Sequence, residues 1–288
     1  PAAIGVTASG HSGTFITEAC EYTNSFLSFF PKIQIILNMD ADHLDFFKDI
    51  DDIAILPEFA ELLPADGTLI INADTPEYET ITRELPCNVL TYGLEHDADY
   101  TAADITWDKT DILPSPFSSG AKKIGSYYLR VPGIHNVSNA LAAIAIGRLL
   151  DLPDDVIVKG LGSFTGTDRR FQYKGEIGGV TIIDDYAHHP TEIEQPFMLK
   201  ELSASEGMVC IPASYLFQKI AFLDDFAKAL SLCDHVIVTD IYAAREKDTG
   251  IVSSKDIVDR MTDYDVDVHY IKEFDDIEKF YFRKLQKK

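Results

Sequence analysis

The amino-acid sequence predicts an α/β protein with two domains. Apolar, strand-like segments alternate with helical segments along most of the chain, a pattern typical of βαβ units and a parallel sheet. The 288 residues are enough to form two separate cores. Several predicted strands end in clusters of ionisable side chains, and open α/β sheets bind their ligands at that edge.

The first half of the chain contains four strand signals separated by helices. Residues 32–38 are apolar on both faces, as expected of a strand buried in a parallel sheet. The predicted strands are 14–19, 32–38, 67–72 and 88–92, and the helices between them are 51–63 and 75–85. Residues 97–132 differ, because short alternating pieces with turn residues Pro114, Pro116 and Gly120 indicate an antiparallel excursion.

Two helices precede a predicted domain boundary near Gly166. Residues 135–150 are rich in Ala and Leu and give the strongest helix signal, and 153–161 is a second helix that Gly162 ends. The boundary divides the chain into domains 1–166 and 167–288, and the second has the size of one small doubly wound unit. In it we predict a hairpin (171–176, 180–183), a helix opened by Pro190, strands at 208–211, 235–239 and 266–271, and helices at 219–232, 254–261 and 275–285.

Composition limits the classes of function. Acidic residues outnumber basic ones 47 to 25, so the net charge of −22 argues against a nucleic-acid partner. No apolar run approaches the roughly 20 residues of a membrane span. The four cysteines are scattered, with no C-x-x-C pair, which favours reduced thiols in a cytoplasmic protein over a zinc site or a disulfide framework.

The most informative segment is 184–192 (Asp-Asp-Tyr-Ala-His-His-Pro-Thr-Glu), which follows the apolar strand at 179–183. Pro190 suits the first position of a helix, where its missing N–H costs nothing. The strand therefore delivers two carboxylates and two imidazoles to a strand-to-helix junction, a typical ligand site. A buried salt-bridge network or a solvated loop could use the same residues.

Two acidic clusters also follow predicted strands. Residues 18–22 (Glu-Ala-Cys-Glu-Tyr) bring Glu18 to one strand end, and 40–45 (Asp-Ala-Asp-His-Leu-Asp) bring His43 to another. Carboxylate oxygen and imidazole nitrogen can ligate Mg²⁺ or Mn²⁺. Helix capping and a solvated acidic loop explain the same residues equally well.

Three further groups suggest nucleotide and substrate contacts. Asn136 and Asn139 share a face at a helix start and could read a heteroaromatic edge, although Asn136 could equally be an N-cap. Residues 166–171 (Gly-Thr-Asp-Arg-Arg-Phe) pair two guanidiniums after a glycine, which suits a polyphosphate. Residues 240–246 (Asp-Ile-Tyr-Ala-Ala-Arg-Glu) follow a strand, as a substrate site or a surface ion pair would.

Taken in order, these motifs resemble those of the Mur ligases over nearly the whole chain. The similarity includes 18–27, 38–45, 133–143, 164–171, 184–192 and 240–246. It implies a central ATP-binding α/β domain followed by a C-terminal Rossmann-like α/β domain. The form of 18–22 together with Ser25, Phe26 and Leu27 is most similar to the branch that joins L-alanine to UDP-N-acetylmuramate.

The resemblance implies an ATP-dependent amide-bond ligase of peptidoglycan precursor synthesis. In this family a carboxylate attacks the γ-phosphate of ATP, and the amine then displaces phosphate from the acyl phosphate. It implies ATP and Mg²⁺ as cofactors, and UDP-N-acetylmuramate and L-alanine as substrates. We expect a monomer or weak dimer with neither nucleic acid nor membrane as a partner.

Roles follow position by position from the same resemblance. Glu18 and His43 would ligate magnesium, while Asn136 and Asn139 would read adenine. Arg170 would contact the phosphates, and Asp185 would hold the ribose. Tyr186 and His188 would lie between nucleotide and amino acid, with His188 orienting or deprotonating the amine.

The chain also departs from the family pattern. No Gly-Lys-Thr of a phosphate-binding loop precedes residue 14, and Ser214 and Gln218 stand where the family has His and Arg. Two hypotheses follow. The chain is part of a longer ligase that lacks its N-terminal domain here, or it is a non-catalytic module that binds a nucleotide or a partner.

Overall fold

The computed structural model describes residues 2–4, 7–9, 13–19, 26–38, 56–76, 78–106, 126–198, 208–211, 222–241 and 253–285. The chain forms two compact units. The first comprises residues 1–101 and 141–151, and the second comprises 102–140 and 152–288. Each unit contains a parallel sheet, so the predicted α/β class is confirmed.

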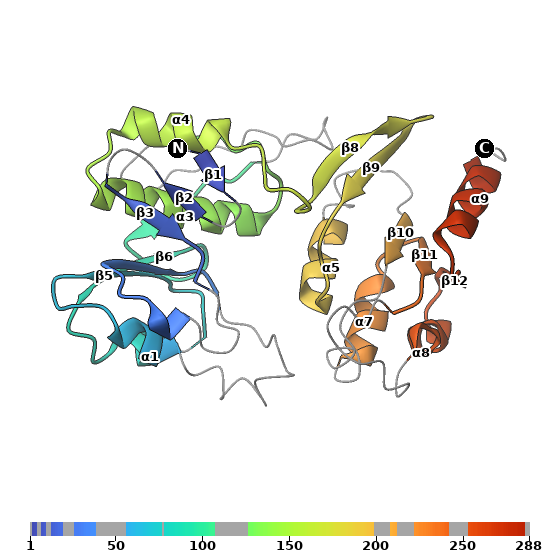
Figure 1. Ribbon diagram of the computed structural model, residues 1–288, viewed down its shortest axis with the longest axis horizontal. Coiled ribbons are helices and arrows are strands. Elements are labelled where there is room, and N and C mark those ends of the chain that lie inside the picture. The colour runs from blue at the N-terminus through green and yellow to red at the C-terminus, as the bar shows by residue number, and fades with distance from the viewer. Residues whose placement is uncertain are drawn as a thin grey trace. The chain divides into compact units, whose positions relative to one another are not determined.

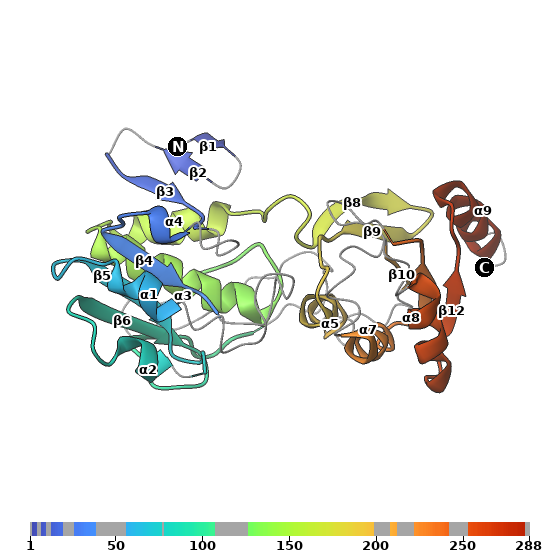
Figure 2. The same ribbon diagram turned by 60° about the horizontal axis from the view of Figure 1, so that its bottom comes forward.

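The sheet of the first unit is parallel throughout, in the order β4-β5-β6-β7. Its strands are β4 (Ile33–Ile36), β5 (Thr68–Asn72), β6 (Asn88–Gly93) and β7 (Tyr100–Thr101), and Figure 2 shows the first three side by side. Helices α1 (Leu56–Glu61) and α2 (Tyr78–Thr82) follow β4 and β5 in the chain. Leu69 and Ile71 of β5 pack with Ala60, Leu63 and Ile81 in one apolar cluster.

A buried tyrosine links two strands of this sheet. The hydroxyl of Tyr92 donates to the carbonyls of Ile36 (3.3 Å) and Leu37 (3.4 Å), and its burial raises the pKa of the phenol. Ahead of the sheet, β1 (Ala2–Ile4), β2 (Thr7–Ser9) and β3 (Phe15–Thr17) form an antiparallel meander. Helices α3 (Ile134–Leu149) and α4 (Asp154–Ser163) come later in the chain (Figure 1).

The second unit contains a hairpin and a three-stranded parallel sheet. The hairpin strands β8 (Gln172–Ile177) and β9 (Val180–Asp184) lead into α5 (Pro190–Met198). The sheet has the order β10-β11-β12, with β10 (Met208–Ile211), β11 (His235–Val238) and β12 (Asp267–Tyr270). The helices are α7 (Leu223–Leu230), α8 (Ser254–Arg260), which the short turn η3 (Met261–Asp263) extends, and α9 (Phe274–Leu285).

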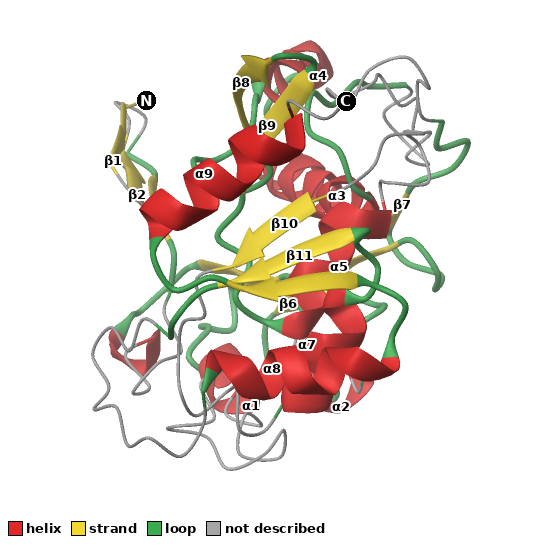
Figure 3. Cartoon of the chain, turned by 90° about the vertical axis from the view of Figure 1, so that its right-hand side faces the viewer, coloured by secondary structure: helices red, strands yellow, loops and turns green. Residues whose placement is uncertain are grey.

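Helices cover both faces of this sheet. Val236 and Val238 of β11 point to one face and pack with Ile193 of α5, Phe226 of α7 and Ile257 of α8. Figure 3 shows α9 on the opposite face, where the ring of Phe280 lies 4.7 Å from that of His269 on β12. β11 is buried on both faces, which explains the continuous apolar run of Val236, Ile237 and Val238.

Three sequence predictions need correction. The strand predicted at 14–19 is β3, which pairs antiparallel with β2 instead of joining the parallel sheet. Within 97–132, the described strand β7 pairs in parallel with β6, so the antiparallel excursion is wrong there. Asp99 determines that pairing, because its carboxylate accepts hydrogen bonds from the backbone N–H and the hydroxyl of Thr91 at 3.0 and 3.1 Å. Helix α4 continues through Gly162 to Ser163, because Gly162 does not adopt the positive φ with which a glycine ends a helix.

The thiol of Cys87 is free. Among the residues described, no helix has both the length and the apolar character needed to cross a membrane.

Candidate functional site

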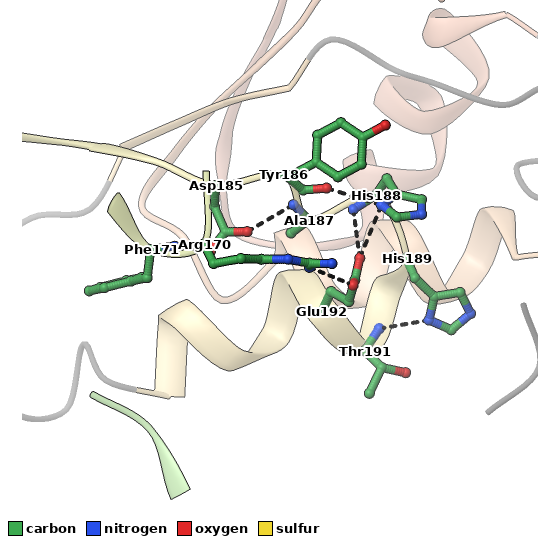
Figure 4. A network of polar contacts seen from close by, with 9 residues as sticks. All are labelled: Arg170, Phe171, Asp185, Tyr186, Ala187, His188, His189, Thr191 and Glu192. Carbon is green, nitrogen blue, oxygen red and sulfur yellow. Dashed lines mark hydrogen bonds and ion pairs between the residues drawn. The ribbon is translucent and has the colours of Figure 1, made fainter. Parts of the chain in front are cut away.

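A polar network lies where β9 ends and α5 begins. β9 ends at Asp184, residues 185–189 form the connection, and α5 starts at Pro190, as the sequence predicted. In the described structure β9 pairs with β8 alone rather than within the parallel sheet. The predicted hairpin is therefore confirmed, whereas the expectation of a parallel-sheet edge is wrong for this motif, whose side chains Figure 4 shows.

Asp185 holds a second loop against this junction. One carboxylate oxygen accepts the backbone N–H of Phe171 at 2.9 Å, and the other accepts that of Ala187 at 2.8 Å. The N–H of Tyr186 donates to the carbonyl of Arg169 at 2.6 Å. Arg169 and Phe171 both have positive φ, 59° and 48°, a conformation that non-glycine residues keep only where surrounding contacts impose it.

The protonation of Asp185 depends on two opposing effects. Burial raises the pKa of this carboxyl, and the hydrogen bonds from Ala187 and Phe171 offset that rise only in part. Both oxygens already accept a backbone N–H, yet each retains a second lone-pair direction. The predicted contact of Asp185 with a ribose therefore stays a prediction, while its structural role is visible directly.

Glu192, on the first turn of α5, joins Arg170 and His188. One carboxylate oxygen pairs with a guanidinium nitrogen of Arg170 at 2.8 Å. The other accepts the backbone N–H of His188 at 3.0 Å and lies 3.2 Å from Nδ1 of its ring. Burial opposes ionisation of Glu192, but the bonds from Arg170 and His188 prevail and lower its pKa.

The two adjacent histidines have different surroundings. His188 Nδ1 lies 3.0 Å from the carbonyl of Tyr186, and the two rings are 5.2 Å apart. His189 is buried with its ring edge-on to Phe222 at 4.9 Å, and its Nε2 has no hydrogen-bond partner in the described structure. His188 therefore belongs to the polar network, and His189 belongs to the apolar packing behind it.

The two asparagines lie on the first turns of α3, as predicted. The side-chain amide of Asn136 donates to the carbonyl of Pro132 at 2.5 Å and lies 3.1 Å from Nε2 of His135. An N-cap would instead accept a backbone N–H through its side-chain oxygen, so the capping alternative does not describe this residue. Asn139 is exposed on the same helix.

The structure describes only some residues of the two acidic clusters. Glu18 is exposed directly after β3, whereas His43 and the rest of 40–45 lie outside the described residues. Ser214, Gln218 and 242–246 lie outside them too. The described residues contain no group of three or more His, Cys, Asp or Glu side chains placed to hold a metal ion.

Sequence reasoning missed two residues beside Asp240. The hydroxyl of Tyr270 donates to the carboxylate of Asp240, and the ammonium of Lys255 lies 5.1 Å from the centre of the tyrosine ring. Register explains the first contact, because Tyr270 is opposite Val238, two residues before Asp240. Knowledge that β11 and β12 are neighbours would have revealed it.

Two family models match successive parts of the chain. The Mur ligase middle domain matches residues 3–147, and the Mur ligase glutamate ligase domain matches 169–288. The chain therefore belongs to the Mur ligase family.

Two curated relatives are similar to this chain over most of its length. The chain is 47% identical over 273 residues to the UDP-N-acetylmuramate–L-alanine ligase of Agathobacter rectalis, covering 94% of this chain and 60% of that protein. It is 44% identical to the enzyme of the same name from Caldanaerobacter subterraneus, covering 94% and 59%. The chain therefore spans about three fifths of the length of these curated relatives.

Solved structures agree on the fold. The UDP-N-acetylmuramate–alanine ligase MurC of Thermotoga maritima is similar with a TM-score of 0.67 and 25% identity, over 88% of this chain and 54% of that chain. MurF of Acinetobacter baumannii shares the fold with a TM-score of 0.72 at 19% identity, over 90% and 54%.

Proposed function

We propose that the full-length protein containing this chain is an ATP-dependent ligase that joins L-alanine to UDP-N-acetylmuramate in peptidoglycan precursor synthesis. The 47% identity to a ligase of that name, over 94% of this chain, is the observation that carries the proposal. The local geometry supports it, because one carboxylate holds a guanidinium and an imidazole together at a helix start.

The side chains at the site suit ATP. Arg170 is 53% exposed and could meet a phosphate while Glu192 holds its other side. The exposed carboxamide of Asn139 has both a donor and an acceptor, as reading an adenine edge requires, and Asn136 would assist from the same face. Bound ATP would supply the phosphoryl group that turns the substrate carboxylate into a reactive acyl phosphate.

Magnesium binding rests on fewer described residues. Glu18 is an exposed carboxylate at a strand end, and carboxylate oxygen is the ligand that Mg²⁺ prefers. We propose that Glu18 and His43 hold the ion. Its charge would neutralise the phosphates in a protein whose own net charge is −22.

In the same proposal, His188 and Tyr186 face the amino-acid substrate. A neutral imidazole can take a proton from an ammonium group near neutral pH. Asp185 would act on the nucleotide side while it keeps the loop of Arg170 in place. The cytoplasm is the compartment in which such a ligase would meet ATP.

A second candidate is a module that binds nucleotide without chemistry. Ser214 and Gln218, which replace a family His and Arg, favour it because a lost cation weakens phosphate or carboxylate binding.

One assay separates the two candidates. Phosphate release from ATP by the full-length protein should require both UDP-N-acetylmuramate and L-alanine. Release with another amino acid in place of L-alanine would refute the specificity but keep the ligase class. ATP binding without any phosphate release would support the binding module and refute the ligase.

A further inference from the structure

Glu192 has more contacts than a helix cap requires. A capping box would need one bond, to the backbone N–H of His189 just before α5, whereas this carboxylate accepts the N–H of His188. The same carboxylate also reaches the Arg170 guanidinium, 22 residues earlier in the chain, and the Nδ1 atom of His188 (Figure 4). Both of its oxygens are therefore committed to the two residues on which the proposed function depends.

The surroundings of Nδ1 determine which nitrogen of His188 carries the proton. Two acceptors lie near Nδ1, the Tyr186 carbonyl at 3.0 Å and the Glu192 carboxylate at 3.2 Å. Neither can donate a hydrogen, so Nδ1 must be the N–H of the ring. The neutral ring then has its lone pair on Nε2, the nitrogen on the far side of the ring from Glu192.

Separate contacts hold the backbone loop and the side chain of Arg170. Asp185 accepts the backbone N–H of Phe171 and so fixes the loop, while Glu192 binds one end of the guanidinium. Because the guanidinium is planar, fixing one nitrogen restricts the directions of the others. Less side-chain entropy is then lost when a phosphate binds.

We propose that Glu192 is a positioning residue that holds Arg170 and His188 in one frame, with His188 Nε2 as the proton acceptor. This inference rests on the proposed ligase function. In that reaction Nε2 takes one proton from the ammonium of the amino acid, and the freed lone pair forms the new C–N bond. The acyl C–O bond breaks, its electron pair leaves with phosphate, and the departing phosphate takes the second proton that the nitrogen loses as it becomes an amide. The negative charge of Glu192 balances the imidazolium that forms.

The first test needs no activity. Ring ¹⁵N NMR spectra of the ¹⁵N-labelled 288-residue chain report the tautomer of each of its eight histidines. They are recorded at a pH high enough for the imidazole rings to be neutral. His188→Gln identifies the resonances of His188. We expect the neutral ring of His188 to carry its proton on Nδ1 and none on Nε2. A protonated Nε2 would overturn the inference, whether or not the ligase proposal holds.

The second test is kinetic and uses the full-length protein. Glu192→Gln keeps the size of the side chain, but its single amide oxygen can accept a hydrogen bond from Arg170 or from His188, not from both. We expect kcat to fall about 10–100-fold and the KM for ATP to rise, as when the residue that orients a catalytic group is lost. Glu194→Gln, on the same helix, is the matched control and should leave both within about twofold of wild type.

Double-mutant cycles distinguish positioning from simple stabilisation. If Glu192 acts through its two partners, Glu192→Gln should cost several-fold less in an Arg170→Gln or His188→Gln background than alone. Fully additive losses, or an unchanged kcat in Glu192→Gln, would overturn the inference. Inactive wild-type protein would refute the ligase proposal, and the ¹⁵N result would still decide the role of the histidine.

Discussion

Two loops in this protein are pinned by an aspartate that follows a β-strand, one in each unit, and they respond to pH in opposite directions. In the first unit, Asp74 follows β5 and accepts the backbone N–H groups of Leu94, Glu95 and His96 at 2.6, 3.1 and 2.9 Å. In the second unit, Asp185 follows β9 and accepts only two backbone N–H groups.

The number of donors explains the difference in pKa. Burial opposes ionisation of both carboxyls. At Asp74 the backbone donors and the His96 ring, whose Nδ1 is 3.0 Å away, more than offset burial and lower the pKa. At Asp185 two donors are too few, so burial dominates and raises the pKa.

The comparison separates a loop built for stability from one that carries a proposed function. The loop at Asp74 follows the end of β6, and its N–H groups converge on one carboxylate. The loop at Asp185 keeps Arg169 and Phe171 at positive φ and presents Arg170 between them. Strained backbone of this kind gathers at functional sites, and neighbouring contacts must stabilise it.

The largest expected effect is on activity and concerns the second loop. Arg170→Gln in the full-length protein should lower kcat/KM for ATP by about 10²–10³-fold, because it removes a cation that would meet the phosphates. Stability should change by less than about 1 kcal/mol, since the guanidinium is half exposed. Steady-state kinetics and thermal melting measure the two effects.

The matched control for Arg170→Gln is Arg260→Gln. It removes the same charge and also breaks an ion pair, in this case with Asp224 on the protein surface. Activity should stay within about twofold of wild type. If both variants lost activity equally, the loop at Asp185 would have no special function.

The next effect is on stability and compares the two aspartates directly. Asp74→Asn should cost about 2 kcal/mol of unfolding free energy, because one amide oxygen cannot replace a carboxylate that accepts several N–H groups. Asp185→Asn should cost about 1 kcal/mol, since burial already disfavours its charged form. Urea unfolding at neutral pH tests the order, and a larger loss at Asp185 would reverse the interpretation.

A change of pH should change the stability costs of Asp74→Asn and Asp185→Asn in opposite directions. The folded-state pKa of Asp74 is lowered, so its contribution is present above the unfolded value of about 4 and is lost as pH falls through the folded pKa. The folded-state pKa of Asp185 is raised, so its contribution to stability is present below the unfolded pKa of about 4 and is lost as pH rises through the folded pKa. The cost of Asp74→Asn should therefore shrink on acidification, and that of Asp185→Asn should grow.

The last effect probes the packing around Asp74. A Cβ at Gly93 would lie 2.9 Å from a carboxylate oxygen of Asp74, which its hydrogen bonds keep from moving away. Gly93→Ala should therefore destabilise the protein by about 1–2 kcal/mol. Gly160→Ala is the control, because a Cβ inside α4 meets nothing within 4 Å and should stabilise by about 0.5–1 kcal/mol. Urea unfolding of both variants provides the check.

The sequence predicted most elements but not the details of their pairing. The helix start at Pro190 and the strand before it were visible because local chemistry specifies them. The hairpin of β8 and β9 was predicted too, but the parallel pairing of β7 was not, since hydrogen-bond partners across strands are distant in sequence. The predicted boundary near Gly166 and the role of His43 stay predictions.

For the site, residue types and their order along the chain were enough to select Arg170, Asp185, Tyr186 and His188. Sequence did not reveal that Glu192 links Arg170 to His188, nor that Asp185 binds the N–H of Phe171, because those partners are 22 and 14 residues apart along the chain. Periodicity and turn chemistry act locally, so the sequence by itself determined the α/β class and the start of α5. Only packing decides which distant groups meet, and the tertiary structure therefore determined the contacts of each carboxylate and, through burial, the direction of its pKa shift.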